Sequence, residues 1–399
     1  MIETAVSLLA WFCFVGAALG ILQAAIGSRL VRRFAGARGG DPAHRPPVTV
    51  LKPLHGDEPL LEVALASVCA QRYPNFQVVF GVGNAADPAL RAVHRVRERF
   101  PDCDIAVVID PARHGRNGKV GNLINMLPAA KHDLLVISDS DVHVAADYLD
   151  RLVAALELPG TGLVTTVYAG LPSSRGWASR LGAAQIAYGF LPGALMARAL
   201  GRQDCLGASM MLRRETLNRI GGLPALVRHL ADDNVLGQLV RRQGLSVRLA
   251  HTVPATTVPE ETLSALFSHE LRWARTIRAL APVSFLLSAV QYPVWWAALG
   301  AALAGCGTVP LVAFGVVWAS RAMFAHRIDR ALALHIPDLA FRVPVWLLPM
   351  RDAMSAVVMV ASYAGRRVAW RGDAMDADGG VRTHPVPPSR PAYAAQESC

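Results

Sequence analysis

Charged residues are scarce in this chain of 399 amino acids: they make up 18% of the sequence, whereas hydrophobic residues make up 53%. Soluble globular proteins carry about 25% charged residues, so this composition predicts apolar segments in addition to an ordinary domain core. A length of 399 residues has room for one large domain plus such segments, but not for three independent domains. The sequence therefore predicts a protein that lies partly in a membrane.

Cysteine is also sparse, and its six residues are scattered without a CxxC or other metal-ligand spacing. We therefore expect reduced thiols and a cytosolic main domain. The formal net charge is +10, yet the sequence lacks a compact run of Lys and Arg interleaved with aromatic residues. This lack argues against nucleic acid as a partner. A basic surface that faces the anionic lipid bilayer is the better interpretation.

The first long apolar segment covers residues 5–26 and predicts a transmembrane anchor at residues 1–28. Roughly 20 apolar residues, at ~1.5 Å each, cross the ~30 Å hydrocarbon core of a bilayer. A cleaved signal peptide is the alternative, but no small-residue cleavage site stands out. Basic residues follow the segment instead of preceding it: Arg29, Arg32, Arg33 and Arg38. The positive-inside rule then predicts a multi-pass protein of the inner membrane, with the next domain in the cytoplasm.

Residues 48–258, after a Pro-rich linker at 41–47, are predicted to form one α/β domain. Short apolar runs alternate here with amphipathic stretches, which predicts βαβ units and a Rossmann-like, mostly parallel sheet. The predicted strands are 48–51, 76–82, 105–109, 134–138 and 163–168, and the predicted helices are 60–71, 88–100, 120–130 and 145–156. Polar residues follow the strands at the edge where open α/β sheets bind ligands: Lys52, Asn84, Asp110 and Asp139.

The sequence changes character beyond Pro254. Residues 262–281 combine apolar residues at helical spacing with arginines on the other side, which predicts an amphipathic helix at the membrane interface. Three apolar runs follow within residues 283–364 and predict a group of C-terminal membrane segments: 283–304, 309–324 and 343–364.

The third apolar run is interrupted by Pro349, Arg351 and Asp352. Charges at membrane depth are unfavourable, so we expect them to be functional or to line a protected cavity. A re-entrant hairpin is the predicted geometry, because it would keep the next basic residues on the cytoplasmic side: Arg366, Arg367 and Arg371. The last segment, residues 373–399, has little apolar periodicity and is expected to be a disordered tail.

The strongest chemical feature is the sequence LLVISDSDV at residues 134–142. A hydrophobic strand there delivers Asp139 and Asp141, two carboxylates on alternating residues, to the polar edge of the sheet. Such oxygens can hold Mg²⁺ or Mn²⁺ against a diphosphate, because hard cations take carboxylate and phosphate oxygens together. The alternative is a solvated turn, since a DxD sequence is common in surface loops.

Two further sequence features contain candidate site residues. Asp233, in the sequence ADDN, opens a predicted helix, where an acidic residue is also explained by capping and by the helix dipole. That dipole would lower the pKa of Asp233. The amphipathic helix contains His269, Arg272 and Trp273; Arg can pair with a diphosphate and Trp can stack on an acceptor or anchor at the interface. An interfacial helix with snorkelling arginine is the alternative there.

In this order the three features resemble the motifs of family-2-like GT-A glycosyltransferases and, in more detail, the ceramide glucosyltransferase family, family 21. The resemblance covers residues 48–370, including the membrane segments. Further motifs carry it: V-T-V-L-K-P-L (48–54), Asp87 in N-A-A-D-P-A (84–89), N-G-K-V-G-N-L (117–123) and G-A-S-M-M-L-R-R (207–214).

The resemblance implies a GT-A catalytic domain plus transmembrane helices, and it implies roles for individual residues. Asp87 would lie in the uridine pocket, Asp139 in the nucleotide and metal site, and Asp233 at the position of the catalytic base. Arg272 and Trp273 would close the acceptor side. Lys119 either meets the donor or is a surface charge at a helix start.

Two departures from the family pattern matter. His269 stands where the last motif begins with Gln or Arg, which puts the usual contact of that position in doubt. The DSD sequence has two carboxylates, whereas eukaryotic ceramide enzymes lack the second one. Asp141 is therefore expected to bind the metal together with Asp139.

The resemblance implies transfer of glucose or N-acetylglucosamine from a UDP-sugar to a lipid hydroxyl, with inversion. Bacterial relatives associated with hopanoid biosynthesis also resemble this sequence, so the expected acceptor is either a ceramide or a hopanoid. A processive polysaccharide synthase of the same fold would need more membrane helices than the sequence predicts. Transfer to polyprenyl phosphate is a further candidate reaction, and a non-enzymatic membrane scaffold is the candidate from a different class of protein.

Overall fold

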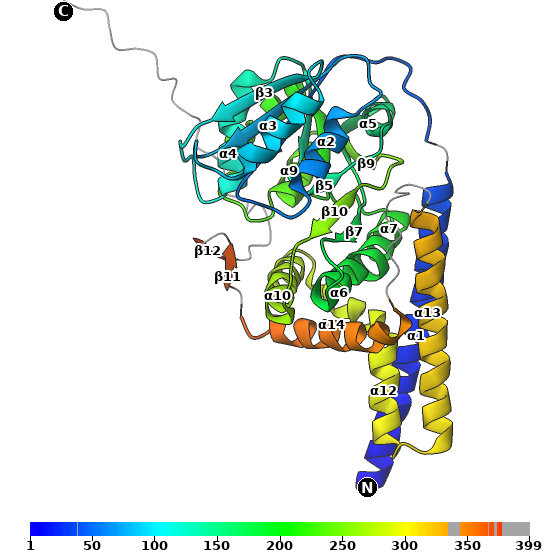
Figure 1. The fold of residues 1–399 in the computed structure, drawn as a ribbon. Coiled ribbons are helices and arrows are strands. Elements are labelled where there is room, and N and C mark those ends of the chain that lie inside the picture. Colours follow the sequence, from blue (N-terminus) through cyan, green and yellow to red (C-terminus); the bar gives the residue numbers. More distant parts are fainter. Residues whose placement is uncertain (38, 334–343, 366, 371–372, 377–399) are drawn as a thin grey trace, which may run out of the picture.

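The computed structural model describes residues 1–37, 39–333, 344–365, 367–370 and 373–376. An α/β domain lies at one end of the molecule, and three helices project from it side by side (Figure 1): α1 (Ile2–Gly36), α12 (Pro293–Leu303) and α13 (Thr308–Leu332). Two further helices lie where these two parts meet: α10 (Leu263–Leu280) and α14 (Leu348–Ser362). The domain therefore rests on a base of helices.

A seven-stranded sheet in the order β3-β2-β1-β4-β8-β6-β9 forms the centre of the domain. Its pairs are parallel except those that β8 makes with β4 and β6. The strands are β1 (Val48–Pro53), β2 (Phe76–Val82), β3 (Asp104–Ile109), β4 (Leu134–Ser138), β6 (Thr161–Thr165), β8 (Ser209–Arg213) and β9 (Ser246–Leu249). The predicted mostly parallel sheet is confirmed.

The strands form here because their side chains are apolar on both faces, which suits a parallel sheet covered on both sides. Along β1, Val48 and Val50 pack into one core cluster and Leu51 into the other, as the two-residue period of a strand requires. The helices that contribute to the first cluster are α2 (Leu61–Cys69), α3 (Ala89–Arg99) and α5 (Tyr148–Leu156), and those of the second are α4 (Gly118–Met126), α8 (Arg214–Arg219) and α9 (Asp232–Arg242).

A small second sheet connects the domain to the helical base. It has the order β5-β10-β7, formed by β5 (Val142–His143), β10 (Ala255–Val258) and β7 (Ala169–Pro172). A helical segment follows β7 and contains one π-helical turn: α6 (Trp177–Gln185), η2 (Ile186–Phe190) and α7 (Leu191–Ala199). The sequence patterns predicted neither this segment nor β8.

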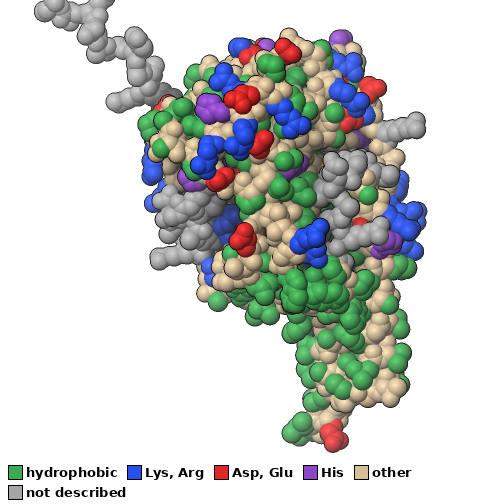
Figure 2. All heavy atoms as spheres, viewed as in Figure 1, with side chains coloured by type: hydrophobic (Ala, Val, Ile, Leu, Met, Phe, Trp, Pro, Cys, Tyr) green, Lys and Arg blue, Asp and Glu red, His purple; other side chains and the backbone are tan. Residues whose placement is uncertain are grey.

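Within the described residues, three helices are long and apolar enough to cross a membrane: Ile2–Gly36, Thr308–Leu332 and Val345–Ser362. A bent pair, Pro282–Gln291 and Pro293–Leu303, is a fourth candidate, with a 66° angle at its break. The short elements of this part are α11 (Pro282–Leu287), η4 (Ser288–Gln291) and η5 (Val345–Leu347). On the face shown in Figure 2, hydrophobic side chains dominate the projecting helices, whereas charged side chains gather on the domain.

The third apolar run differs from the predicted hairpin. Residues 345–362 form one short 3₁₀ turn and one helix, α14, which runs across the direction of the projecting helices (Figure 1). Its charges have partners within the protein, so no turn is needed to remove them from lipid: Arg351 pairs with Glu270, and Asp352 accepts a hydrogen bond from the main-chain nitrogen of Val294.

The end of the chain was predicted to be a disordered tail from residue 373. Residues 373–376 instead form strand β12 (Asp373–Asp376), which pairs with β11 (Arg367–Trp370). The remainder of that predicted tail, residues 377–399, lies outside the described residues.

Candidate active site

A cavity of about 1240 Å³ opens along the edge of the sheet where β1, β2 and β4 end. Its lining includes all the residues that the sequence analysis selected: Asp87, Lys119, Asp139, Asp141, Asp233, His269, Arg272 and Trp273. Residues that lie more than 180 positions apart in the chain thus share one space. The loops after the strands form one side of the cavity, and α7, α10, α11 and α14 form the side next to the helical base.

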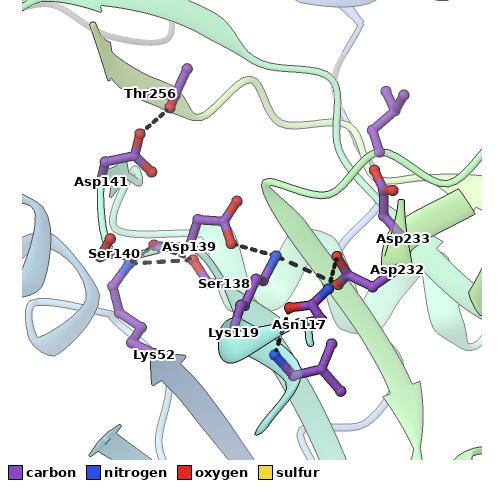
Figure 3. Close-up of polar contacts among 12 residues, drawn as sticks. Lys52, Asn117, Lys119, Ser138, Asp139, Ser140, Asp141, Asp232, Asp233 and Thr256 are labelled. Carbon is purple, nitrogen blue, oxygen red and sulfur yellow. Dashed lines mark hydrogen bonds and ion pairs between the residues drawn. The ribbon is translucent and has the colours of Figure 1, made fainter. Parts of the chain in front are cut away.

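The turn after β4 carries the two carboxylates and is held from below by Lys52 (Figure 3). Lys52 is fully buried, and its Nζ donates to the carbonyl oxygens of Asp139 (2.7 Å) and Val142 (3.3 Å) and to Oγ of Ser138 (3.3 Å). All three ammonium protons therefore have acceptors. Burial lowers the pKa of Lys52 to about 8, although Asp141 and Asp139 oppose that shift.

Asp141 lies on the side of this turn that faces β10. Its Oδ2 accepts a hydrogen bond from Oγ1 of Thr256 (2.7 Å), and its carbonyl oxygen accepts one from the main-chain nitrogen of Thr257 (3.1 Å). Burial, followed by repulsion from Asp139, raises the pKa of Asp141 to about 6. A nearby cation would relieve both effects, because it stabilises the charged form.

Lys119 links the DSD turn to the start of α9. Its Nζ lies 2.6 Å from Oδ1 of Asp139 and 3.8 Å from Oδ2 of Asp232 (Figure 3). Burial alone would lower the pKa of Lys119, but Asp139 and Asp232 outweigh it and raise that pKa. Asn117 completes the link: its Nδ2 donates to Asp232, and its Oδ1 accepts from Val120 at the start of α4. The surface-charge interpretation of Lys119 is therefore wrong.

Asp233 follows Asp232 at the beginning of α9. Its Oδ1 accepts a hydrogen bond from the main-chain nitrogen of Asn234 (2.7 Å). Gly207 leaves room for the other oxygen, since a Cβ there would meet Oδ2 of Asp233 at 2.9 Å. Burial, followed by repulsion from Asp232, raises the pKa of Asp233 to about 7. The prediction that the helix dipole lowers this pKa is wrong, because desolvation and a neighbouring carboxylate dominate.

Asp87 lines the cavity between two loops. Its Oδ1 accepts from the main-chain nitrogens of Gly56 and Ala89, both at 2.9 Å. These bonds connect the loop after β1 with the start of α3. The carboxylate is thereby fixed where the loops after β1 and β2 meet, at an edge that binds nucleotides in open α/β sheets.

The side chains from α10 form the opposite wall. Nδ1 of His269 is hydrogen-bonded to Glu260, and the His269 ring lies edge-on to Trp273, with centroids 4.6 Å apart. Burial alone would raise the pKa of Glu260, but the contact with His269 outweighs it and lowers that pKa. His269 therefore has a partner of its own at the position where the family motif has Gln or Arg.

The two carboxylates of the DSD turn have the chemistry of ligands for a divalent cation that would also bind the oxygens of a diphosphate. In the described part of the chain, no group of three or more His, Cys, Asp or Glu residues could hold a metal by itself. Mg²⁺ is commonly held by one or two carboxylates and takes its other ligands from phosphates and water. Asp139 and Asp141 supply that number of carboxylates.

Several residues of the site escaped the sequence analysis. Lys52 was noted as a polar residue at a strand end, but it was given no role. Asp232 stands beside Asp233 in the sequence ADDN, but its ion pair with Lys119 was not predicted. Gln291 lies in the apolar run 283–304, where an uncharged polar residue was a signal that could have been used. The contact between Lys119 and Asp232, by contrast, joins segments whose proximity only the fold reveals.

The sheet, the acidic edge and the cavity define a glycosyltransferase with a GT-A fold. The model of glycosyl transferase family 21 matches residues 12–383, and the chain belongs to that family.

Among solved structures, the mannosyltransferase PcManGT from Pyrobaculum calidifontis, in complex with GDP-Man and Mn²⁺, superposes with a TM-score of 0.50 at 23% identity, covering 90% of this chain and 99% of that one. At this identity the similarity shows the fold alone.

The chain is also similar to three proteins whose names describe sugar transfer. The ceramide glucosyltransferase of Komagataella phaffii is 34% identical over 113 residues, which are 27% of this chain and 22% of that protein. Ceramide glucosyltransferase 1 of Caenorhabditis elegans is 23% identical over 250 residues, or 62% of this chain and 53% of that protein. An N-acetylglucosaminyltransferase of Bradyrhizobium diazoefficiens is 25% identical over 246 residues, or 58% and 49%. The alignments span between about a fifth and half of these relatives.

Proposed function

We propose that this glycosyltransferase moves glucose or N-acetylglucosamine from a UDP-sugar to a hydroxyl group of a ceramide-type or hopanoid-type lipid, with inversion. The observation that carries the proposal is that one continuous cavity runs from the acidic edge of the sheet to the helices at the base of the domain. A water-soluble donor and a lipid acceptor can therefore meet beside Asp233. The names of the ceramide glucosyltransferases and of the N-acetylglucosaminyltransferase support the acceptor and the two sugars.

The donor would lie along the edge of the sheet. Asp87 lines the end of the cavity for the uridine, Lys119 can reach a diphosphate oxygen, and Asp139 with Asp141 would hold Mg²⁺ or Mn²⁺. When bound there, such a cation offsets the charge that grows on the departing diphosphate. The Mn²⁺ in the mannosyltransferase complex supports this choice of cofactor.

Asp233 would act as the general base. The lipid hydroxyl oxygen attacks the anomeric carbon, its proton passes to the Asp233 carboxylate, and the bond from that carbon to the diphosphate oxygen breaks, so that UDP leaves. One displacement inverts the anomeric centre, and an α-linked donor then gives a β-linked product. A base with a pKa of about 7 is well suited to this role near neutral pH.

The membrane placement is part of the proposal. The arginines after residue 28 favour a cytoplasmic α/β domain at the inner membrane, and Trp273 and Arg272 lie where the acceptor would enter. Up to four candidate spans lie in the described residues, fewer than a processive synthase needs for a translocation channel. A base beside the cavity also favours a hydroxyl acceptor over polyprenyl phosphate, which brings its own anion.

Lipid analysis of a deletion strain tests the proposal. One glycolipid should vanish and should return when the wild-type gene is restored, but not when the Asp233→Asn gene is restored at equal protein level. An unchanged glycolipid profile in the deletion strain would contradict the proposed function.

A further inference from the structure

Tyr168 is a residue of the cavity to which the proposed reaction gives no role. It lies between β6 and β7 and lines the cavity. Its hydroxyl is close enough to Asp233, Asp139 and Asp141 for their charges to act on it, and Asp233 acts most strongly. Burial, followed by these three carboxylates, raises the pKa of Tyr168. The hydroxyl therefore keeps its proton at neutral pH and can donate a hydrogen bond.

The hydroxyl of Tyr168 forms no hydrogen bond with the described residues. Buried tyrosine hydroxyls usually have a partner, and two other tyrosines of the domain follow that rule. Tyr73 donates to the carbonyl oxygen of Pro46 (2.7 Å). Tyr148 donates to Oγ of Ser209 (2.9 Å). Tyr168 is partly exposed and lines the cavity, so its hydroxyl is available to a bound molecule.

Aromatic neighbours hold the ring of Tyr168 in place. Its centroid lies 4.5 Å from that of the Phe190 ring, with 31° between the ring planes. Aromatic rings at this separation attract one another. Phe190 and Trp273 also line the cavity, and all three aromatic side chains pack against one hydrophobic cluster: Ala183, Ile186 and Val258. The hydroxyl is thus carried by a ring with a fixed position.

The main chain next to Tyr168 is fixed relative to the DSD turn. The following residue, Ala169, begins β7 and donates its main-chain N–H to the carbonyl oxygen of Pro254 (2.9 Å). β7 pairs with β10 along its length, and Thr256 of β10 donates to the carboxylate of Asp141. One small sheet thus links the tyrosine to a proposed metal ligand. A side chain held in this way has little freedom to lose when a ligand binds.

In the proposed reaction, the sugar connects the two parts of the site that act on this hydroxyl. The diphosphate would lie at Asp139 and Asp141, and the acceptor hydroxyl would attack the sugar beside Asp233. The sugar ring must therefore occupy the space between these carboxylates, and all three act on Tyr168. A hexose has C–H groups on its ring faces and hydroxyl groups at its rim. An aromatic ring that carries a hydroxyl can contact both kinds of group.

We propose that Tyr168 recognises the sugar that is transferred: its hydroxyl donates a hydrogen bond to a hydroxyl oxygen of that sugar, and its ring packs against the C–H groups. This inference rests on the proposed function, and it makes Tyr168 a specificity-determining residue for the donor. Asp87 and Lys119 would hold the nucleotide part of the donor, whereas Tyr168 holds the part that moves. UDP, which lacks the sugar, makes no contact with the tyrosine hydroxyl.

Tyr168→Phe tests the proposal, because it removes the hydroxyl and keeps the ring. Calorimetry on the full-length, detergent-solubilised protein should show about tenfold weaker binding of the better-bound of UDP-glucose and UDP-N-acetylglucosamine, since a sugar hydroxyl loses its partner. Binding of UDP should stay unchanged. Tyr73→Phe is the matched control: Tyr73 is buried outside the cavity lining, so both affinities should be retained. Equal changes for UDP and for the UDP-sugar in Tyr168→Phe, including no change in either, would overturn the proposal.

Deoxy analogues of the donor test the contact itself. In the wild-type protein, removal of one particular sugar hydroxyl should weaken binding by about the same factor as Tyr168→Phe does. In Tyr168→Phe, that analogue should bind as well as the parent UDP-sugar, because the two changes remove the same hydrogen bond. Additive losses for every analogue would overturn the proposal. So would normal donor binding with a shifted pH midpoint of turnover, since the hydroxyl would then act on Asp233 instead.

The role of Tyr168 and the proposed function fail in different ways. A wild-type protein that binds no UDP-sugar would refute both. A wild-type protein that glycosylates lipids, with a Tyr168→Phe variant that does not distinguish UDP from the UDP-sugar, would refute the role of Tyr168 alone. The expected pattern of donor binding in a protein that glycosylates no lipid would support the role of Tyr168 and refute the proposed acceptor.

Discussion

At the scale of residues, burial and the crowding of like charges determine the pKa values of the site's carboxylates. Asp139, Asp232 and Asp233 all act on the Lys119 ammonium, and Asp232 and Asp233 are neighbours at a buried helix start. A carboxylate next to another one and away from water favours its neutral form. Burial, followed by this crowding, raises the pKa of Asp233 and outweighs the helix dipole.

The first prediction concerns pH. Because the pKa of Asp233 is raised to about 7, the group is protonated below that pH and cannot accept a proton. The turnover number should therefore fall about tenfold per pH unit as pH decreases below roughly 6.5. Asp232→Asn removes the neighbouring charge, so it should move the midpoint to lower pH. A turnover number that is constant from pH 5.5 to 8 would show that Asp233 is not the base.

The second prediction concerns the cation. Asp139→Ala and Asp141→Ala should abolish the increase in UDP-sugar affinity that Mn²⁺ produces, because the diphosphate loses its bridge to the protein. Titration calorimetry with and without Mn²⁺ measures this difference. Asp104→Ala is a suitable control, since Asp104 is a surface residue paired with Lys131. Donor affinity that stays unchanged in both site variants would refute the metal assignment.

The sequence predicted these carboxylates well but not their environment. Asp139 and Asp141 follow a hydrophobic strand, and that local pattern is visible without a structure. The contacts of Lys52 with the turn and of Lys119 with Asp232 span about 90 and 113 positions, and no local periodicity encodes them. Burial, which reverses the expected shift in the pKa of Asp233, is likewise a property of the whole fold.

At the scale of elements, one buried ion pair ties the site to the helical base. Arg351 of α14 donates from Nη1 and Nη2 to the two carboxylate oxygens of Glu270 on α10, each at 2.6 Å. Arg351 also donates to Oγ of Ser355 and to the carbonyl oxygen of Leu181 in α6. Three helices thus meet at one guanidinium. Glu270 follows His269 directly, so the pair fixes the part of α10 that faces the cavity.

The third prediction follows from this pair. Glu270→Leu leaves Arg351 buried without its carboxylate and should lower the free energy of unfolding by about 3–5 kcal/mol. The double variant Glu270→Leu with Arg351→Met should recover most of that loss. Glu215→Leu breaks an exposed pair with Arg219 and should change stability by less than about 1 kcal/mol. Urea unfolding in detergent measures all three, and equal effects of the two single variants would contradict this assignment.

Some helices and strands could be predicted from the sequence, and others could not. The strand at 134–138 and the strand at 76–82 have the predicted bounds, because both are continuous apolar runs between polar turns. β8 was missed, since its residues belong to the stretch G-A-S-M-M-L-R-R, which was used only as a motif. The hairpin was predicted because the ion pair that neutralises Arg351 cannot be seen in the sequence.

At the scale of the whole molecule, charge and hydrophobicity separate along one axis. The chain starts at the tip of the projecting helices, and the turn between α12 and α13 lies at the same end (Figure 1). The α/β domain lies at the other end, next to the arginines that close α1. This arrangement, taken with the positive-inside rule, supports the proposed placement of the domain in the cytoplasm, with the tip on the opposite side of the membrane.

The fourth prediction uses a native cysteine. Cys306 is exposed in the turn between α12 and α13, whereas Cys13, Cys69 and Cys205 are buried. A membrane-impermeant maleimide added to intact cells with a permeable outer membrane should label Cys306, and Cys306→Ser should lose that label. A cysteine placed at Gly40, in the Cys306→Ser background, should react only after the inner membrane is opened. Labelling of Gly40→Cys in intact cells would contradict the proposed topology and indicate the opposite orientation.

The fifth prediction and most direct test is the stereochemistry of the product. The purified full-length protein should convert an α-linked UDP-sugar and a short-chain ceramide into UDP and a β-linked glycolipid, as seen in the coupling constant of the anomeric proton. Asp233→Asn should bind the donor normally but transfer at least about 10²-fold more slowly. An α-linked product, or near-normal transfer by Asp233→Asn, would contradict inverting transfer with Asp233 as the base.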